Sequence, residues 1–283
     1  MLNPPTMLHN YKRNVYSQYG EDGVLEKIFE ILPELDRWCV EFGAWDGSFL
    51  SNTKNLIESK NYSAVLIEGN EKKSAELKKQ HSSKTNVYTI NSYVGFSEND
   101  SLDEILSEIP IPKTFDLLSI DIDGNDYHVW KALKKYHPKV VVIEFNPTIQ
   151  NEVRFVQAAD LNINQGSSLR SIVELGGEKG YELVFVSKVN AIFVKKEFYG
   201  LFELESNSIE ELRLDSDLIT NLFVGFDGTV FIDGFGKLPW HGIEINQSKI
   251  QSLPGFLRTF KSNYNFMQRR LYSIFEFVKS KSA

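Results

Sequence analysis

Residues 38–47 read WCVEFGAWDG, and this stretch decides the fold. Its first six residues form a short apolar run that ends in glycine, a pattern typical of a strand followed by a tight turn. A helix is expected behind the turn, over residues 52–60, and a second strand over 64–68. The stretch therefore predicts the first strand of a sheet in which strands and helices alternate.

The same alternation continues on both sides of this stretch. Residues 24–32 are apolar at helical spacing behind Asp22, which we expect to cap a helix that ends at Pro33. Residues 115–121 and 140–145 are continuously apolar, as expected of strands covered on both faces of a parallel sheet. The alternation indicates a doubly wound α/β architecture. Further strands are expected over 86–91, 181–187 and 191–195, the last two as a hairpin, and further helices over 72–80, 102–108, 126–136 and 168–176.

The pattern changes after residue 198, so three parts are expected. Residues 1–36 form a lead segment with one helix, and 37–198 form the α/β domain. Residues 199–283 form a C-terminal extension, in which a hairpin is expected over 222–232 because Phe226-Asp227-Gly228 is a turn signal between two β-rich runs.

The tail of this extension, residues 263–278, is rich in aromatic and basic residues. Residues 241–283 contain seven Lys/Arg and two Asp/Glu. The tail either packs as a helix on its own core or docks on the acidic body, on a partner chain or on a membrane surface. A homo-oligomer and a peripheral membrane contact therefore both stay open.

Composition limits the function classes. The 283 residues carry a formal net charge of −7, which argues against a general nucleic-acid coat. No apolar run is long enough to span a bilayer, and the first ten residues lack a signal-type stretch, so a cytoplasmic protein is expected. Cys39 is the single cysteine, which excludes an intrachain disulfide and a cysteine-based zinc site.

Ligands of open α/β sheets bind outside the carboxyl ends of the strands, so the residues that end each strand are the candidate site. Strand one ends in Glu41, and Gly43 and Gly47 then permit a tight turn and a close approach to a ligand. An acid before the first glycine repels phosphate but suits a cationic ligand. The pattern favours S-adenosylmethionine, with its positive amino and sulfonium groups, over a nucleoside triphosphate.

The second strand ends in Glu68, about where dinucleotide-type folds hold the ribose hydroxyls. The motif Gly-x-Gly-x-x-Gly is absent, which makes a nicotinamide-dependent dehydrogenase the weaker interpretation. Asn91 and Ser92 lie at the end of the third strand, where an adenine would lie.

Acids also gather at the ends of the fourth and fifth strands. Asp121 or Asp123, with Glu144 and Asn146, could supply oxygen ligands to Mg²⁺ from adjacent strands. These acids and His128 are candidates for the base that takes a proton from a substrate hydroxyl. Asp126 is interpreted as a helix cap.

Several of these segments together resemble the FkbM-type methyltransferases, part of the larger S-adenosylmethionine-dependent superfamily with a seven-stranded sheet. The similarity spans roughly residues 15–198 and has no counterpart for 199–283. Trp45 departs from it, since many members have a small residue there, so its ring is expected outside the cofactor cleft or over one of its walls. The segments that carry the resemblance are SQYGEDG (17–23), EFGAWDG (41–47), SNT (51–53), LIEGN (66–70), DIDG (121–124), IEFN (143–146), GSSL (166–169) and GY (180–181).

The resemblance implies a Rossmann-like fold, S-adenosylmethionine as methyl donor, and O-methylation of a hydroxyl on a sugar, glycan or related small molecule. It implies that Asp121 faces the cofactor's amino group or a metal and that Glu68 holds the ribose. The residues expected at the methionine end are Glu41, Gly43, Asp46 and Gly47, and Asn52 of the SNT segment is a further candidate for binding the cofactor.

Two alternatives remain from the residues alone. Asp121-x-Asp123 is a dyad of the kind that holds a metal against a nucleotide-sugar diphosphate, which would make the protein a glycosyltransferase. A non-catalytic binding module on the same fold, with the basic tail as its working surface, is the other. The loops 146–165 and 234–247 are expected to select the acceptor.

Overall fold

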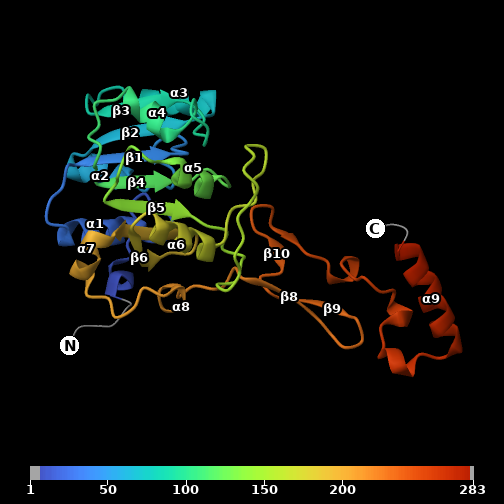
Figure 1. Cartoon of the computed structure of the whole chain (residues 1–283). Helices are drawn as coiled ribbons and strands as arrows, with labels where there is room; N and C mark the ends of the chain where they lie inside the picture. The colour runs from blue at the N-terminus through green and yellow to red at the C-terminus, as the bar shows by residue number, and fades with distance from the viewer. Residues whose placement is uncertain (1–6, 281–283) are drawn as a thin grey trace. The chain divides into compact units, whose positions relative to one another are not determined.

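A seven-stranded sheet runs through the first of two units in the computed structural model, which describes residues 7–280 (Figure 1). The units are Met1–Ser216 and Asp217–Ala283. Strands β3, β2, β1, β4 and β5 are parallel in that spatial order, and β7 and β6 add an antiparallel hairpin at the β5 edge. The predicted α/β fold with a terminal hairpin is confirmed. The strands are β1 (Trp38–Phe42), β2 (Ser63–Glu68), β3 (Val87–Asn91), β4 (Leu117–Ile120), β5 (Val140–Glu144), β6 (Tyr181–Val186) and β7 (Asn190–Lys195).

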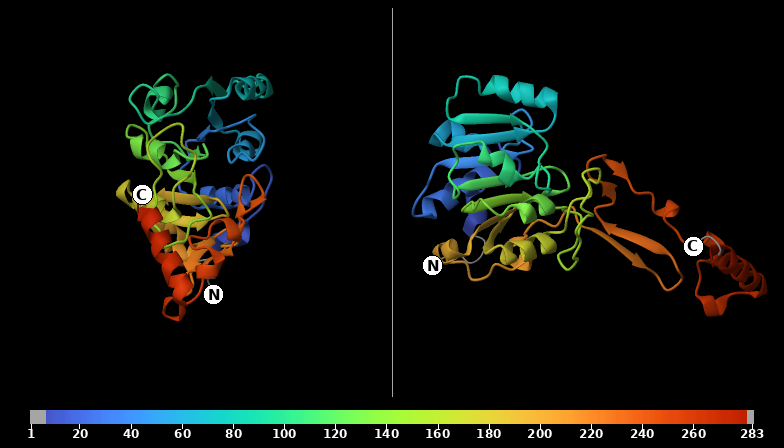
Figure 2. Two further views of the ribbon diagram at one scale, coloured as in Figure 1. Left: turned by 90° about the vertical axis from the view of Figure 1, so that its right-hand side faces the viewer. Right: turned by 45° about the horizontal axis from the view of Figure 1, so that its top comes forward.

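Helices cover both faces of this sheet, as both views of Figure 2 show. Successive strand residues point to opposite faces, so Val40 joins a core with α4, α5 and α6, while Cys39 joins one with α1, α2 and α3. Burial on both faces explains why 115–121 and 140–145 are apolar at consecutive positions. The helices are α1 (Glu21–Ile31), α2 (Lys54–Lys60), α3 (Glu71–Gln80), α4 (Leu102–Ser107), α5 (Asp126–Ala132), α6 (Leu169–Glu178), α7 (Lys196–Tyr199) and α8 (Ile209–Leu212), with short 3₁₀ turns η1 (Met7–Tyr11) and η2 (Gly200–Phe202).

The start of helix α1 corrects one prediction. Asp22 lies inside helix α1. The N-cap of this helix is Gly20, whose backbone is in the left-handed region at φ 99°. The Asp22 carboxylate accepts hydrogen bonds from the backbone N–H groups of Val15, Tyr16 and Ser17 at 2.7–2.8 Å. The acid therefore closes the loop that leads into the helix and does not cap it.

The first unit continues beyond residue 198, to Ser216. Phe202, Ile209 and Leu212 are buried in the apolar clusters on the two faces of the sheet. These contacts assign residues 199–216 to the α/β unit.

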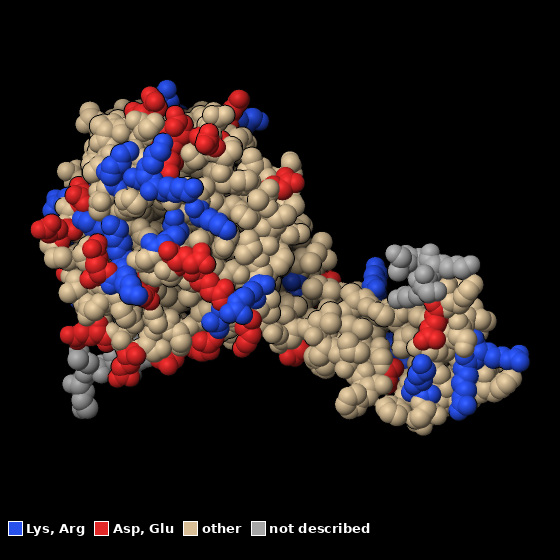
Figure 3. Space-filling model, viewed as in Figure 1, with Lys and Arg blue, Asp and Glu red and all other residues tan. Residues whose placement is uncertain are grey.

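The second unit begins with the predicted hairpin, made of β8 (Thr220–Val224) and β9 (Val230–Gly234). A short pair, β10 (Lys237–Leu238) and β11 (Ile243–Glu244), follows it. Three 3₁₀ turns then lead to helix α9 (Phe266–Ser280): η3 (Gln247–Lys249), η4 (Gly255–Leu257) and η5 (Lys261–Asn263). Figure 3 shows acidic and basic side chains interspersed on the visible face of the first unit and mostly basic ones on that of the second. Within residues 7–280, no helix has the length and apolar character needed to cross a membrane.

Candidate functional site

The ends of four parallel strands lie side by side at one edge of the sheet. Phe42 pairs with Ile67 on one side and with Ile120 on the other, and Ile120 pairs with Ile143. The residues that follow these positions, Gly43, Glu68, Asp121 and Glu144, therefore share the carboxyl edge. The structure brings together the strand ends that the sequence predicts as the site.

The glycine turn is pressed against the end of β4. Gly43 and Gly47 have φ of 74° and 76°, in the left-handed region that favours glycine. A Cβ atom at position 43 would lie 1.6 Å from the carbonyl oxygen of Asp121, so only glycine fits there. Trp45, also at positive φ, is 46% exposed, and the Lys73 ammonium lies 4.7 Å from its ring centre. The Trp45 ring therefore lies on the outer side of the turn.

Glu68 ties this turn to β2. Its two carboxylate oxygens accept one backbone N–H each, from Trp45 at 2.8 Å and from Asn70 at 2.7 Å. A carboxylate has about four lone-pair positions, so each oxygen can accept a further hydrogen bond. The Glu68 carbonyl accepts from the Asn91 amide at 2.8 Å and from the Ser92 N–H at 3.2 Å. Glu68 thus fixes the turn and keeps acceptor capacity for ligand hydroxyls.

Glu41 is buried and holds the segment 51–53. Its carboxylate accepts from the Ser51 hydroxyl at 2.6 Å, the Thr53 hydroxyl at 2.7 Å and the Asn52 N–H at 2.8 Å. Burial raises the pKa of Glu41, and these three donors partly offset the rise. The Asn52 amide donates to the Ser119 hydroxyl on β4 at 3.1 Å. In this structure Glu41 and Asn52 position the strand-end loops, and a direct cofactor contact from either stays a prediction.

Asp46 closes the second half of the turn. Its carboxylate accepts the backbone N–H groups of Ser48 and Phe49 at 2.9 and 2.8 Å. Partial burial favours a higher pKa for Asp46, but these donors and the nearby Lys73 outweigh it, so the pKa is lowered. Asp46 is therefore a stable anion beside the turn.

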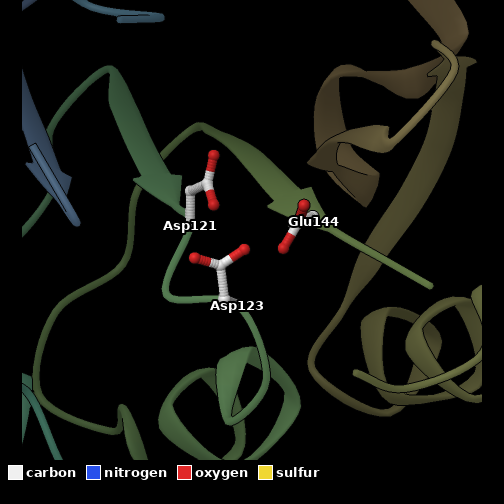
Figure 4. Close-up of side chains that lie close together, drawn as sticks. All are labelled: Asp121, Asp123 and Glu144. Carbon is white, nitrogen blue, oxygen red and sulfur yellow. The ribbon is translucent and has the colours of Figure 1, made fainter. Parts of the chain in front are cut away.

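Three carboxylates converge at the ends of β4 and β5 (Figure 4). One oxygen each from Asp121, Asp123 and Glu144 lies within 4.8 Å of the others. None of the described residues donates a hydrogen bond to these three carboxylates. Burial, and then the neighbouring acids, raise the pKa of Asp121 and Glu144 well above the usual range, and partial burial raises the pKa of the more exposed Asp123. Like charges crowded in this way favour a bound cation or bound protons.

The turn between Asp121 and helix α5 is stabilised by the side chain of Asp126, the first residue of the helix. The Asp126 carboxylate accepts from the backbone N–H groups of Ile122 at 2.9 Å and Gly124 at 2.8 Å. The helix cap is Asn125, so the prediction that Asp126 caps the helix is wrong: its carboxylate reaches back to the turn before the helix. This clamp keeps Asp123 at φ 54° facing Asp121 and Glu144.

Asn146 makes local hydrogen bonds in this structure, and a metal contact from it stays a prediction. Its amide oxygen accepts from the Thr148 N–H at 2.9 Å and the Thr148 hydroxyl at 2.7 Å, and its amide nitrogen donates to the Gln165 carbonyl at 2.8 Å. An Asn that folds back on the next residues in this way makes a local turn. Asn146 therefore shapes the loop after β5.

His128 lies in the first turn of α5, half-buried between Phe96 and Tyr127. Its Nε2 atom is 2.8 Å from the carbonyl oxygen of Gln157. A carbonyl only accepts, so Nε2 must carry the hydrogen, which leaves the lone pair of the neutral ring on Nδ1. If His128 is the base, Nδ1 is the atom that takes the proton.

Two residues at this edge were missed as site residues. Glu21 is fully buried and accepts from the Asn190 amide at 3.1 Å. Asn190 pairs directly with Glu144 across β5 and β7, and Glu21 adds to the negative charge that raises the pKa of Asp121. Glu21 lies in the SQYGEDG segment of the family resemblance, but no local pattern joins it to Asn190, a residue 169 positions away.

The loop after β5 is fastened to this site. The buried Gln157 side chain accepts from the Gln165 and Gly166 N–H groups at 2.8 and 2.9 Å. The Asn164 amide donates to the Asp123 carbonyl at 3.1 Å. This part of the loop therefore borders the carboxylate cluster, where the sequence predicts an acceptor-selecting loop.

His81 lies beneath the turn and makes stability depend on pH. Burial, and then the Lys54 charge, lower the pKa of His81, which is 3% exposed. Below about pH 6.5 the unfolded chain therefore binds a proton that the folded chain does not. The free energy of unfolding then decreases as the pH is lowered, until the pH reaches the pKa of His81 in the folded state. We expect His81→Gln to remove a slope of up to about 1.4 kcal/mol per pH unit in this window. Urea unfolding between pH 7.5 and 5 measures this, with exposed His137→Gln as control; equal slopes in both variants would contradict it.

Comparison with known proteins finds a family model that matches more than half of the chain. The model, described as the methyltransferase FkbM domain, matches residues 23–183. No curated protein matches the sequence.

Similar solved structures share low sequence identity with this chain. A SAM-dependent methyltransferase from Aquifex aeolicus is 12% identical with a TM-score of 0.38, the similarity covering 68% of this chain and 97% of that one. The N-terminal domain of EvdMO1 with SAH bound is 11% identical with a TM-score of 0.40, covering 62% and 80%. The glycopeptide N-methyltransferase MtfA, complexed with (S)-adenosyl-L-methionine, is 10% identical with a TM-score of 0.37, covering 65% and 89%.

Proposed function

Since the chain belongs to the FkbM methyltransferase family, we propose that it uses S-adenosylmethionine to methylate a hydroxyl group of a sugar, glycan or related small molecule. The observation that carries the proposal is the cluster of Asp121, Asp123 and Glu144. One oxygen of each carboxylate lies within 4.8 Å of the others, and the Asp121 backbone lies against the glycine turn. An acidic strand edge suits a cationic cofactor and a hydroxyl-bearing acceptor, and it repels phosphate.

The residues at the edge fit such a cofactor chemically. Glu68 retains lone pairs for two ribose hydroxyls, and the Gly43–Gly47 turn leaves backbone close to the ligand. Asp121 would face the amino group or the metal, and Asn91 and Ser92 would contact the adenine. When bound, S-adenosylmethionine supplies a methyl group on a positively charged sulfur.

This chain's own residues must align the acceptor hydroxyl and remove its proton. Alignment of the reacting groups contributes several kcal/mol in favourable cases. Carboxylates whose pKa is raised can hold the proton, as can Nδ1 of His128. We propose that Asp121, Asp123 and Glu144 bind Mg²⁺ or a similar cation, which would lower the pKa of an acceptor hydroxyl.

Metal binding has its own expected result. At about ten times the dissociation constant, Mg²⁺ should stabilise the fold by about 1.4 kcal/mol, which raises Tm by about 3–5 °C. The variant Asp123→Asn/Glu144→Gln should show no rise, whereas Glu174→Gln, an exposed acid on α6, should behave as the wild type. Thermal scans with Mg²⁺, Mn²⁺ and Ca²⁺ make the measurement. No shift with any ion, together with full activity in excess EDTA after dialysis, would reject the metal.

Methyl transfer itself is tested by product mass. The protein is incubated with methyl-deuterated S-adenosylmethionine and a panel of hydroxyl-bearing acceptors, and a product heavier by one labelled methyl group is expected. Turnover of UDP or GDP sugars instead would favour the Asp-x-Asp glycosyltransferase, which family membership disfavours. Absence of both products and of cofactor binding would favour the non-catalytic module.

A further inference from the structure

Helix α9 of the C-terminal unit exposes a continuous apolar side. Phe266, Met267 and Ile274 are 72%, 70% and 60% exposed, and Leu271 is exposed as well. With 3.6 residues per turn these positions fall on one side of the helix, which Phe277 and Val278, both exposed, extend. The helix thus presents large aliphatic and aromatic side chains outward from its own unit.

The other side of α9 is where the unit holds the helix. The Tyr272 ring packs on the buried Tyr264 ring at 5.6 Å, and Gln268 donates to the Phe256 carbonyl at 2.8 Å. Arg269 donates to the Tyr264 carbonyl at 3.0 Å. These contacts fix the rotation of α9, so its apolar side is a set feature of the unit.

The charge around this helix is strongly positive. From residue 245 to 283 the sequence has seven Lys/Arg and a single Asp/Glu, Glu276. Arg270 lies over the Phe266 ring at 4.6 Å, on the same side of the helix and one turn along it, and Figure 3 shows basic side chains on this unit. An occupant of the apolar side must therefore be apolar and anionic at once.

Two surfaces of the protein itself could cover the apolar side: helix α9 of a second copy, and the acidic residues 1–244. Neither is clearly both apolar and anionic. The same helix of a second copy is apolar but carries the same positive charge. Residues 1–244 are acidic, with 24 Lys/Arg and 37 Asp/Glu, and the face of the first unit that Figure 3 shows carries charged side chains of both signs among the others. An anionic lipid surface offers apolar acyl chains directly below negative headgroups, which meets both conditions.

We propose that α9 lies in the interface of an anionic lipid membrane. Phe266, Met267, Leu271 and Ile274 enter the boundary of the acyl chains, while Arg270 reaches the headgroup phosphates. Long basic side chains can keep their charge in the polar layer while their stems cover apolar surface. The helix binds along the surface and does not span it.

Vesicle flotation of the full chain tests this proposal. Vesicles of phosphatidylcholine alone are compared with equal parts phosphatidylcholine and phosphatidylglycerol. We expect the protein to float with the anionic vesicles only, and less so as NaCl rises. Equal flotation with both lipids, or none, would overturn the proposal.

Two neighbouring substitutions with the same charge change separate the apolar contact from the charge. Ser273→Glu, on an exposed position at the edge of the apolar side, adds the charge without removing an apolar side chain and should lower the partition coefficient about fivefold, the effect of one charge near an anionic surface. Ile274→Glu should lower it at least about fiftyfold, because it also removes an apolar contact. Helix content from circular dichroism checks both folds. Equal losses, or a dimer in light scattering that Ile274→Glu disperses without any vesicle binding, would contradict a lipid occupant.

Discussion

Gly43→Ala is expected to lower the free energy of unfolding by roughly 3 kcal/mol or more. Alanine at φ 74° costs about 1–2 kcal/mol through its own backbone. The added Cβ would also lie 1.6 Å from the Asp121 carbonyl oxygen, so the turn after β1 and the end of β4 must separate. Because Asp121 belongs to the carboxylate cluster, the same change should lower activity in the molecules that still fold.

Gly177→Ala is the matched control for this prediction. Gly177 lies in helix α6 with nothing within 4 Å of an added Cβ, so alanine there should stabilise the helix by about 0.5–1 kcal/mol. Urea unfolding of both variants and the wild type gives the comparison. If Gly43→Ala unfolds at the wild-type midpoint, the close approach of the turn to β4 does not exist in solution.

Asp121→Asn is expected to lower kcat/KM at least about 100-fold while leaving the fold intact. The amide keeps the shape of the side chain but removes one of the three negative charges that hold a cation or a proton. Repulsion among Asp121, Asp123 and Glu144 also falls, so the stability at neutral pH should be equal to or higher than that of the wild type. Lost activity could then not be attributed to unfolding.

Glu174→Gln serves as the control acid for this second prediction. Its carboxylate pairs with Arg154 on the surface, which contributes little to stability. Methyl transfer rates and Tm values of the two variants are compared under the same conditions. Wild-type kcat/KM in Asp121→Asn would remove the carboxylate cluster from the chemistry.

The layers of the fold follow from the sequence because burial on two faces leaves a local pattern. The runs 115–121 and 140–145 became β4 and β5, and the turn at Phe226-Asp227-Gly228 separates β8 from β9. The ends of helices were less predictable. Asp22 and Asp126 look like caps in sequence, yet each carboxylate accepts from backbone donors that precede its own helix. A short polar side chain has several local donors to choose from, and spacing alone does not select one.

The position of the candidate site could be predicted from the order of the strands. Parallel strands end at one edge, so Gly43, Glu68, Asp121 and Glu144 had to lie near one another. The partners of each side chain were not predictable in the same way. Asn146 folds back on Thr148, and Glu21 meets Asn190 across the chain, because these contacts depend on loop geometry and distant packing.

Calorimetric titration of the full chain with S-adenosylhomocysteine tests the central claim most directly. We expect saturable binding of one molecule per chain, competed by S-adenosylmethionine and weakened at least about tenfold by Glu68→Gln, since each lost hydrogen bond to a charged group is worth about 1.5–3 kcal/mol. No binding heat with either nucleoside, alongside saturable binding of a UDP or GDP sugar, would contradict a sulfonium-nucleoside site at this edge of the sheet.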